Sequence, residues 1–404
     1  MNKSTIFTGQ PIFTQVLSLI PKSIVKEVCK RHQSDHYSKK FFFHDHLVTM
    51  LFSSFHSCSG LREVITGMQA EGERLRHLGL KNTPRKSTLA DSNVKRSHKA
   101  FEELFHQLVS HFYKSLPDSR SKNDIRRLFI IDSTTFTLFS SVMRGAGTYG
   151  LNGKKKGGAK AHVVLDSLTD TPVFIRITEG RMSDKTFLNH LNIPSNSTVV
   201  LDKGYNQYNT FSGWSRNDIR WFTRLNNAAV YETMEELPLA EEQIGLGVLD
   251  DQIIKLGNPK TRKQTPLQDA RLVRYWDKES KREFLFVTND FTSTPYEVAE
   301  MYRRRWQIEM FFKRLKQNFP LKCFLGDSEN AIRIQIWCSL ISDLLIKVVM
   351  DKMQTKRKWS FANLSGLIRI HLGTYINLWA FLKNPEESLL NYKPPDRPIQ
   401  TTLF

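Results

Sequence analysis

The spacing of apolar residues predicts that the first part of the chain is helical. Apolar residues recur at intervals of three and four in SIVKEVCK, residues 23–30, and in FEELFHQLVSHFYKSL, residues 101–116. This period places them along one face of an α-helix. We therefore expect residues 1–120 to form a helical domain. The basic amphipathic segment 84–105 makes it a candidate DNA-binding domain, although a plain helical bundle fits the pattern equally well.

Near residue 126 the pattern changes to short, β-branched apolar runs, which are typical of strands. Residues 206–290 stay strand-rich but are less regular, and DKESKR, residues 277–282, suits a hairpin connection. We expect an α/β fold in which a core domain, residues 121–330, contains a β-rich insertion at 206–290. Four apolar runs precede the insertion: RRLFIIDSTTF (126–136), KAHVVLDS (160–167), PVFIRITEG (172–180) and STVVLDKGY (197–205).

Helical spacing returns at Pro295, a residue that suits the first turn of a helix. We expect this helix to continue through YRRRWQIEMFFKRLK, residues 302–316, and further helices to fill residues 331–390. The apolar stretch 334–350 is short and contains charged residues, so it indicates a buried helix and not a membrane span. The proline-rich residues 391–404 are expected to form a tail.

The charge balance indicates a polyanionic partner. The chain has 59 Lys and Arg residues against 40 Asp and Glu residues, a net charge of +19. Nucleic acid is the commonest partner of such a protein, and an anionic membrane surface is the competing explanation. The four cysteines show no CxxC spacing, and the first residues lack the apolar core of a signal peptide. We therefore expect a cytoplasmic protein.

One acid stands among many cations in residues 302–316. On a helix, Tyr302, Arg305, Glu309, Lys313 and Lys316 share one stripe, because they follow each other at intervals of three or four. A solvated face with two i,i+4 ion pairs would explain this pattern at a gain of only about 0.2–0.5 kcal/mol per pair. In the functional interpretation, the cations bind phosphates and the acid binds a metal ion.

A metal site of that kind needs further carboxylates at the ends of buried strands. Three apolar runs end in aspartate, at Asp132, Asp166 and Asp202. Asp166 precedes SLTDTP, a tight-turn composition, so we expect it to cap a turn. Neither STTF after Asp132 nor KGY after Asp202 looks like a simple hairpin turn. Asp132, Asp202 and Glu309 are therefore the candidate ligands.

These residues resemble the YREKK signature of bacterial insertion-sequence DDE transposases, of the insertion-sequence family four type. The spacing Tyr-x2-Arg-x3-Glu-x3-Lys-x2-Lys matches at all five positions from Tyr302 to Lys316. The resemblance extends to IIDST, KAHVVLD, VVLDKGY and FTRL, and covers about residues 87–325. It implies an RNase H-like catalytic core and DNA cleavage and joining that use two Mg²⁺ ions, for which Mn²⁺ can substitute.

By the same resemblance, Asp132, Asp202 and Glu309 are the catalytic and metal-binding residues. The implied partner is double-stranded DNA, both element ends and target, bound by a homodimer or a larger assembly. The alternatives are a non-catalytic DNA-binding regulator and a metal-dependent endonuclease. The resemblance also implies a bacterial protein that is associated with the nucleoid when it binds DNA, and we expect no membrane contact. The expected DNA contacts are Tyr302, Arg305, Trp306, Lys313, Lys316, Lys160, His162 and Arg224.

Overall fold

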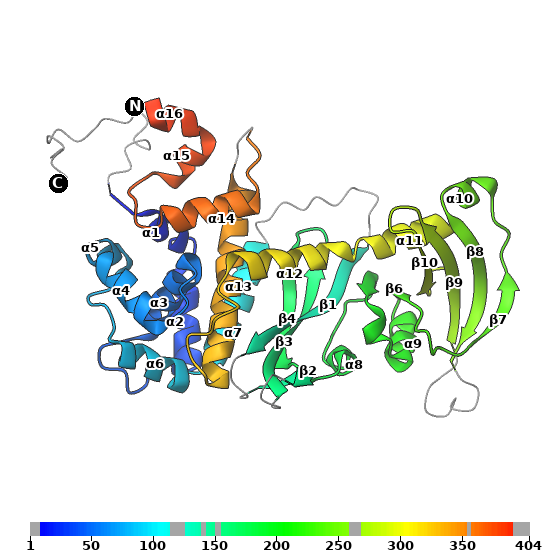
Figure 1. Ribbon diagram of the computed structural model, residues 1–404, viewed down its shortest axis with the longest axis horizontal. Coiled ribbons are helices and arrows are strands. Elements are labelled where there is room, and N and C mark those ends of the chain that lie inside the picture. Colours follow the sequence, from blue (N-terminus) through cyan, green and yellow to red (C-terminus); the bar gives the residue numbers. More distant parts are fainter. Residues whose placement is uncertain are drawn as a thin grey trace. The chain divides into compact units, whose positions relative to one another are not determined.

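The computed structural model of the chain divides into two compact units (Figure 1). The first contains residues 1–108, 318–320 and 334–404, and the second contains residues 109–317 and 321–333. The expected tail at 391–404 lies outside the described residues. The structure describes residues 9–113, 126–138, 143–149, 155–257, 268–353 and 357–390, without the side chains of 113, 144–149, 155–156 and 388–390.

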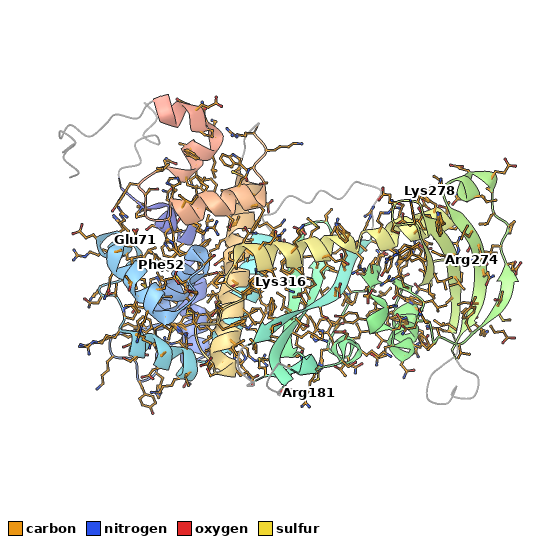
Figure 2. All side chains as sticks on the ribbon, viewed as in Figure 1. Phe52, Glu71, Arg181, Arg274, Lys278 and Lys316 are labelled. Carbon is orange, nitrogen blue, oxygen red and sulfur yellow. The ribbon has the colours of Figure 1, made fainter. Side chains whose placement is uncertain are left out.

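Helices make up the regular structure described for the first unit, as the apolar spacing predicts. Aromatic side chains hold part of its core: Phe13 packs edge-on against Phe52 (labelled in Figure 2) and against Phe55. The expected buried helix at 334–350 lies within α13, and most of its side chains are buried. The helices are α1 (Ile12–Leu17), α2 (Lys22–Arg31), α3 (Phe43–His56), α4 (Leu61–Ala70), α5 (Gly72–Leu75), the 3₁₀ turn η1 (Arg76–Leu78), α6 (Lys86–Lys95), α7 (His98–Tyr113), α13 (Glu329–Lys352), α14 (Phe361–Ile370), α15 (Leu378–Lys383) and α16 (Pro385–Leu390). Among the described helices, none has both the length and the apolar character that crossing a membrane requires.

The second unit is built on one large mixed sheet. Its described strands follow the order β2-β3-β1-β5-β6-β10-β9-β8-β7, and β4 also pairs with β3. β1 is antiparallel to β3 but parallel to β5, and β5 is parallel to β6. The strands are β1 (Arg127–Leu138), β2 (Arg144–Tyr149), β3 (Lys155–Asp166), β4 (Thr171–Glu179), β5 (Ser197–Leu201), β6 (Ile219–Arg224), β7 (Tyr231–Glu236), β8 (Val248–Leu256), β9 (Gln268–Asp277) and β10 (Arg282–Thr288).

Short helical elements connect several of these strands. Their apolar residues join those of β1 and β5 in one core; Phe211 of α9, for example, stacks on Trp221 of β6. A second core joins Val200 and Phe222 to α11. The helical elements of this unit are α8 (Asp184–Leu188), the 3₁₀ turn η2 (Lys203–Tyr205), α9 (Tyr208–Arg216), α10 (Glu241–Gly245), α11 (Pro295–Arg303) and α12 (Trp306–Asn318).

The four strands expected before residue 206 are confirmed as β1, β3, β4 and β5, and the expected hairpin joins β9 to β10. Asp166 caps its turn as predicted, since its Oδ1 accepts hydrogen bonds from the backbone N–H groups of Leu168 and Thr169. The short strands β2, β7 and β8 and the helix α9 are additions to the expected elements.

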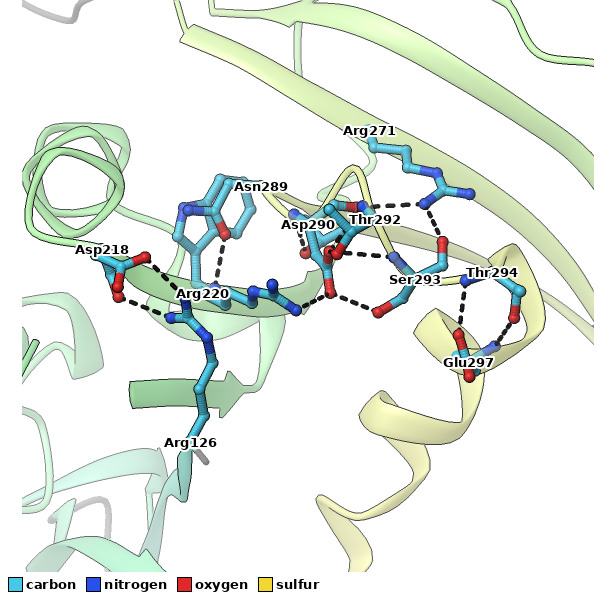
Figure 3. A network of polar contacts seen from close by, with 12 residues as sticks. Arg126, Asp218, Arg220, Arg271, Asn289, Asp290, Thr292, Ser293, Thr294 and Glu297 are labelled. Atoms are coloured by element: carbon cyan, nitrogen blue, oxygen red, sulfur yellow. Dashed lines mark hydrogen bonds and ion pairs between the residues drawn. The ribbon is translucent and has the colours of Figure 1, made fainter. Parts of the chain in front are cut away.

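The helix expected through residues 302–316 is instead two helices. α11 begins at Pro295, as predicted, and Thr294 and Glu297 form a capping box at its start (Figure 3). α11 ends at Arg303, and α12 begins at Trp306. Because Arg305 lies in the turn between them, it does not share one continuous helical stripe with Glu309 and Lys313.

Candidate active site

Asp132 lies in the middle of β1, where buried Ile130 and Ile131 fix the strand in the sheet. Its Oδ1 accepts a hydrogen bond from the Ser133 backbone N–H at 2.7 Å, and its Oδ2 accepts one from Arg305 Nη1 at 2.9 Å. Burial raises the pKa of Asp132 to about 6, although the Ser133 N–H and Arg305 oppose the rise. The negative charges of two other acids, described next, also raise it.

Asp202 follows the fully buried strand β5 and caps the turn η2. Its Oδ2 accepts a hydrogen bond from Gly204 N at 3.2 Å. Its Oδ1 accepts one from Arg224 Nη2 at 2.9 Å and a longer one from the Tyr302 hydroxyl at 3.4 Å. Burial alone would raise the pKa of Asp202, but the hydrogen bonds from Arg224 and Gly204 outweigh burial and hold this pKa below its usual range.

Glu309 lies in the first turn of α12, one helical turn after Arg305. The Arg305 guanidinium donates to Glu309 Oε1 through Nη2 and to Asp132 through Nη1, so one cation joins two of the candidate carboxylates. Arg305 also lies over the Tyr302 ring, 5.7 Å from its centroid. Burial works against the charge on Arg305, but Tyr302, Asp132 and Glu309 outweigh it and raise its pKa above the usual range.

The three carboxylates lie in one electrostatic neighbourhood, because the charges of Asp202 and Glu309 both act on Asp132. Across the part of the chain that the structure describes, no three His, Cys, Asp or Glu side chains are spaced to hold a metal ion as they stand. Between Asp132 and Glu309 the guanidinium of Arg305 takes the place of such a cation. Carboxylate oxygens are the donors that Mg²⁺ prefers, so the chemistry of these three side chains fits a divalent ion.

The cations of the signature differ in exposure. Lys313 is exposed, whereas Lys316 (labelled in Figure 2) is half-buried over the Phe136 ring, with 5.6 Å from Nζ to the centroid. Burial lowers the pKa of Lys316. Trp306 is 61% exposed, so its ring is not part of the core. Tyr302 is nearly buried, and burial raises its pKa to about 12.

The structure places the remaining expected DNA contacts in different surroundings. Arg224 ends β6 and binds Asp202. Lys160 lies on β3, where its Nζ donates to the Met182 carbonyl at 2.9 Å. His162 is completely buried on the same strand, and its ring stacks on Phe187. This burial leaves His162 no surface for the expected DNA contact.

Comparison of the sequence with known proteins identifies the family. The family model described as "Transposase DDE domain" matches residues 123–343, more than half of the 404 residues. A second model, "Domain of unknown function (DUF4372)", matches residues 8–81.

Three curated relatives are transposases by name. The putative transposase y4zB of Sinorhizobium fredii is 28% identical over 66% of this chain and 72% of its own length. The probable transposase for insertion sequence element IS5377 of Geobacillus stearothermophilus is 23% identical over 63% of this chain and 65% of its own. The putative transposase for insertion sequence element IS4SA of Synechocystis is 24% identical over 65% of this chain and 71% of its own.

A solved piggyBac transposase synaptic complex with hairpin DNA covers 97% of this chain and 86% of its own at 12% identity, with a TM-score of 0.41 that is too low to bear on the fold. The family match rests on the sequence, and it spans the strands and the helix that carry Asp132, Asp202 and Glu309. The chain belongs to the transposase DDE-domain family and is a DNA transposase of the insertion-sequence type.

Proposed function

We propose that this transposase cuts the ends of its insertion sequence and joins them to target DNA by two-metal phosphoryl transfer at Asp132, Asp202 and Glu309. One observation carries the proposal: Asp132 of β1 and Glu309 of α12, far apart in the sequence, bind the same guanidinium of Arg305. Asp202 completes the group through its electrostatic effect on Asp132. The electrostatic coupling of three acids from distant segments supports this proposal.

The strand arrangement supports an RNase H-like core for this unit. β1, β3 and β4 are consecutive antiparallel neighbours, and β5 and β6 continue the sheet in parallel on the other side of β1. The two aspartates lie on the adjacent parallel strands β1 and β5 or at their ends, and a late helix supplies the glutamate. Strands β7 to β10 extend the sheet beyond β6, which agrees with a β-rich insertion in the core.

The acids and cations have separate roles in this proposal. Bound to the three carboxylates, divalent ions would supply Lewis acidity that activates water or a DNA 3′-OH and stabilises the leaving oxygen. The side chains of Asp132 and Asp202 are fixed by hydrogen bonds from Ser133 N and Gly204 N, so their geometry is set before DNA binds. No covalent intermediate with the protein is required.

Arg305 changes partner in this proposal. In the structure it neutralises Asp132 and Glu309. If Asp132 and Glu309 held divalent ions instead, the guanidinium would be available for a DNA phosphate, which it could bind through two parallel N–H groups. Lys313 and Lys316 would add phosphate contacts, whereas Lys160 is engaged with Asp184. The exposed ring of Trp306 offers a surface on which a base can stack.

The test uses purified protein and linear DNA that carries the gene's own flanking sequence, with Mg²⁺ or Mn²⁺. Products are mapped to the nucleotide for the wild type, for Glu309→Gln, and for Glu300→Gln as a matched control. Glu300 is also an arginine-paired glutamate, on α11, but its partner is Arg303. We expect cuts at defined ends that leave 3′-OH groups in the wild type and the control, and at least about a hundredfold less cutting in Glu309→Gln.

Two other outcomes separate the alternatives. If the wild type binds the DNA but neither it nor the control cuts, the protein acts as a DNA-binding regulator, and the catalytic assignment is wrong. If the wild type cuts but never joins a cut end to a second duplex, it is an endonuclease. Mass measurement of the protein on paired ends tests the proposed homodimer or larger assembly.

A further inference from the structure

A second polar cluster lies on the face of β1 opposite to Asp132. Successive side chains of a strand point to opposite faces, so Ser133 points away from Asp132. The Ser133 hydroxyl donates to Asp184 Oδ1 at 2.9 Å. Asp184 is the first residue of α8, and no part of the mechanism above uses it. We call Ser133, Lys160, His162, Asp184 and Tyr205 the Asp184 network.

Two side chains of β3 converge on the same carboxylate oxygen. Lys160 Nζ donates to Asp184 Oδ1 at 3.2 Å, and His162 Nδ1 lies 3.5 Å from it. Both residues point to the same face of the sheet, because they are two positions apart on one strand. The side chain of Lys160 is 12% exposed and that of His162 is 1% exposed, so Asp184 is their main electrostatic partner in a largely dry environment.

His162 extends the network to the turn that carries Asp202. Burial lowers the pKa of His162 to about 4, so the ring is neutral. Its Nε2 lies 3.1 Å from the Thr178 hydroxyl, and its Nδ1 lies 3.4 Å from the buried Tyr205 hydroxyl. Tyr205 is the last residue of η2, the turn that begins directly after Asp202.

Asp184 also faces Asp202 across Gly204. A Cβ atom placed on Gly204 would lie 3.6 Å from Asp184 Oδ2 and 3.6 Å from Asp202 Oδ2. The two carboxylates therefore line the same small space beside this glycine. Asp184 is thus connected to the residue after Asp132, through Ser133, and to the turn after Asp202, through His162 and Tyr205.

We propose that Asp184 is a positioning residue of the transposase, which holds the segments bearing Asp132 and Asp202 at the separation that metal binding requires. This inference rests on the proposed two-metal function. Its physical basis is the sensitivity of metal sites to the groups that orient the ligands. Ser133 and Lys160 donate to Oδ1 of Asp184, which fixes this carboxylate against β1 and β3. His162 and Tyr205 extend the network to the turn after Asp202.

The experiment compares Asp184→Asn with Asp290→Asn. Asp290 is a matched control, because it is a buried carboxylate of the same unit that binds Arg220, Thr292 and Ser293 (Figure 3). Arg220 lies near the end of β6 opposite to Arg224, the partner of Asp202. For each variant we measure Mn²⁺ binding by electron paramagnetic resonance, DNA affinity, single-turnover cleavage and the unfolding midpoint. Ser133→Ala is a milder variant, which removes one hydrogen bond and keeps Asp184.

We expect Asp184→Asn to weaken Mn²⁺ binding by about 10–100-fold. Its cleavage rate should fall by about a hundredfold with DNA affinity nearly unchanged. Ser133→Ala should change Mn²⁺ binding and cleavage in the same direction but less. Asp290→Asn should lower only the unfolding midpoint.

Three results would overturn the inference. The first is Mn²⁺ binding by Asp184→Asn that equals that of the wild type. The second is an equal loss of Mn²⁺ binding in Asp290→Asn, which would reflect general destabilisation. The third is a loss in Asp184→Asn as complete as in Asp202→Asn, which would make Asp184 a ligand itself. Failure of the wild type to cut DNA speaks against the proposed function instead, and the Mn²⁺ measurements still decide the role of Asp184.

Discussion

At the scale of single residues, the surroundings of Asp132 disfavour its negative charge. It is largely buried, and two other acids act on it, while Arg305 only partly compensates. A group in this state binds a proton more tightly in the folded protein than in the unfolded chain. Such groups are common at functional sites, where stability is lost in exchange for binding or chemistry.

The stability of the metal-free protein should therefore depend on Asp132 in a defined pH range. The pKa of Asp132 rises from 3.8 to about 6 on folding. The folded state then binds more protons between these values, so this group's contribution to stability falls as the pH rises from about 4 to about 6 and stays low above. Asp132→Asn removes the charge, and at pH 7.5 it should raise the free energy of unfolding by about 1–3 kcal/mol.

Urea unfolding in EDTA at pH 4.5 and pH 7.5 measures this effect. The difference between variant and wild type should be small at pH 4.5 and favour the variant at pH 7.5. Added Mg²⁺ should stabilise the wild type only, because a ligand stabilises the state that binds it. A variant less stable than the wild type at pH 7.5 would contradict the inference that folding disfavours the charge of Asp132.

Lys313 should contribute one phosphate contact. It is exposed on the helix that carries Glu309. Lys313→Ala should weaken binding to all DNA sequences alike and reduce the slope of log K against log salt by about one. The control is Lys278→Ala, another exposed lysine, in the turn between β9 and β10 (Figure 2). Equal slopes for Lys313→Ala and the wild type would remove Lys313 from the DNA-binding residues.

At the scale of elements, the start of α11 sets where Tyr302 and the following turn lie. Thr294 Oγ1 accepts from Glu297 N at 3.3 Å, and Glu297 Oε2 accepts from Thr294 N at 2.7 Å. Thr294→Ala should cost about 1 kcal/mol of stability, the usual loss for an N-cap. Urea unfolding measures this loss. Cleavage in buffer without urea should not change, and a large fall in cleavage would show that the cap also shapes the site.

The sequence predicted those elements whose own residues determine them. Residues 129–131 of β1 and 199–201 of β5 are continuous apolar runs because both faces of the sheet are buried there, and Pro295 marks a helix start by its chemistry. β7 was not predictable in this way, since YETMEE is exposed along its whole length and has no apolar face. The domain boundaries expected at residues 120, 330 and 390 stay predictions.

The candidate site, too, was predictable only where residues close together in the sequence determine it. The spacing in residues 302–316 was enough to select Glu309 and its cations, but it did not predict the break at Arg305. No proline or glycine marks that break, and in the structure Arg305 bonds to Asp132, a residue of a distant strand. The sequence does not predict the role of Asp184 for the same reason. Its partners Ser133 and Lys160 come from two strands, and only the fold brings them together.

At the scale of the whole molecule, the positive charge is unevenly distributed. Residues 230–254 contain no lysine or arginine, although the chain carries +19. Several of their acids are exposed on β7 and α10. Such a segment repels a phosphate backbone over roughly a Debye length, about 8–10 Å at moderate salt. The acids of this segment are Glu232, Glu235, Glu236, Glu241, Glu242, Asp250 and Asp251.

DNA should therefore cross-link to one exposed residue and not to another. Trp306 is 61% exposed beside Arg305, and Met234 is 56% exposed on β7. With a photoreactive phenylalanine analogue at either position, irradiation of the DNA complex should give cross-links at position 306 only. Comparable yields at both positions would show that the acidic segment also contacts DNA.

The exposed edge of β7 also affects how the protein associates with itself in the absence of DNA. It is the last described strand of the sheet, so one of its edges presents backbone N–H and C=O groups that β8 does not use. An open edge of this kind can pair with a strand of another molecule and start aggregation. Glu232, Glu235 and Glu236 place carboxylates on both faces of β7. Two such edges repel each other, which protects a large open sheet from growing by self-association.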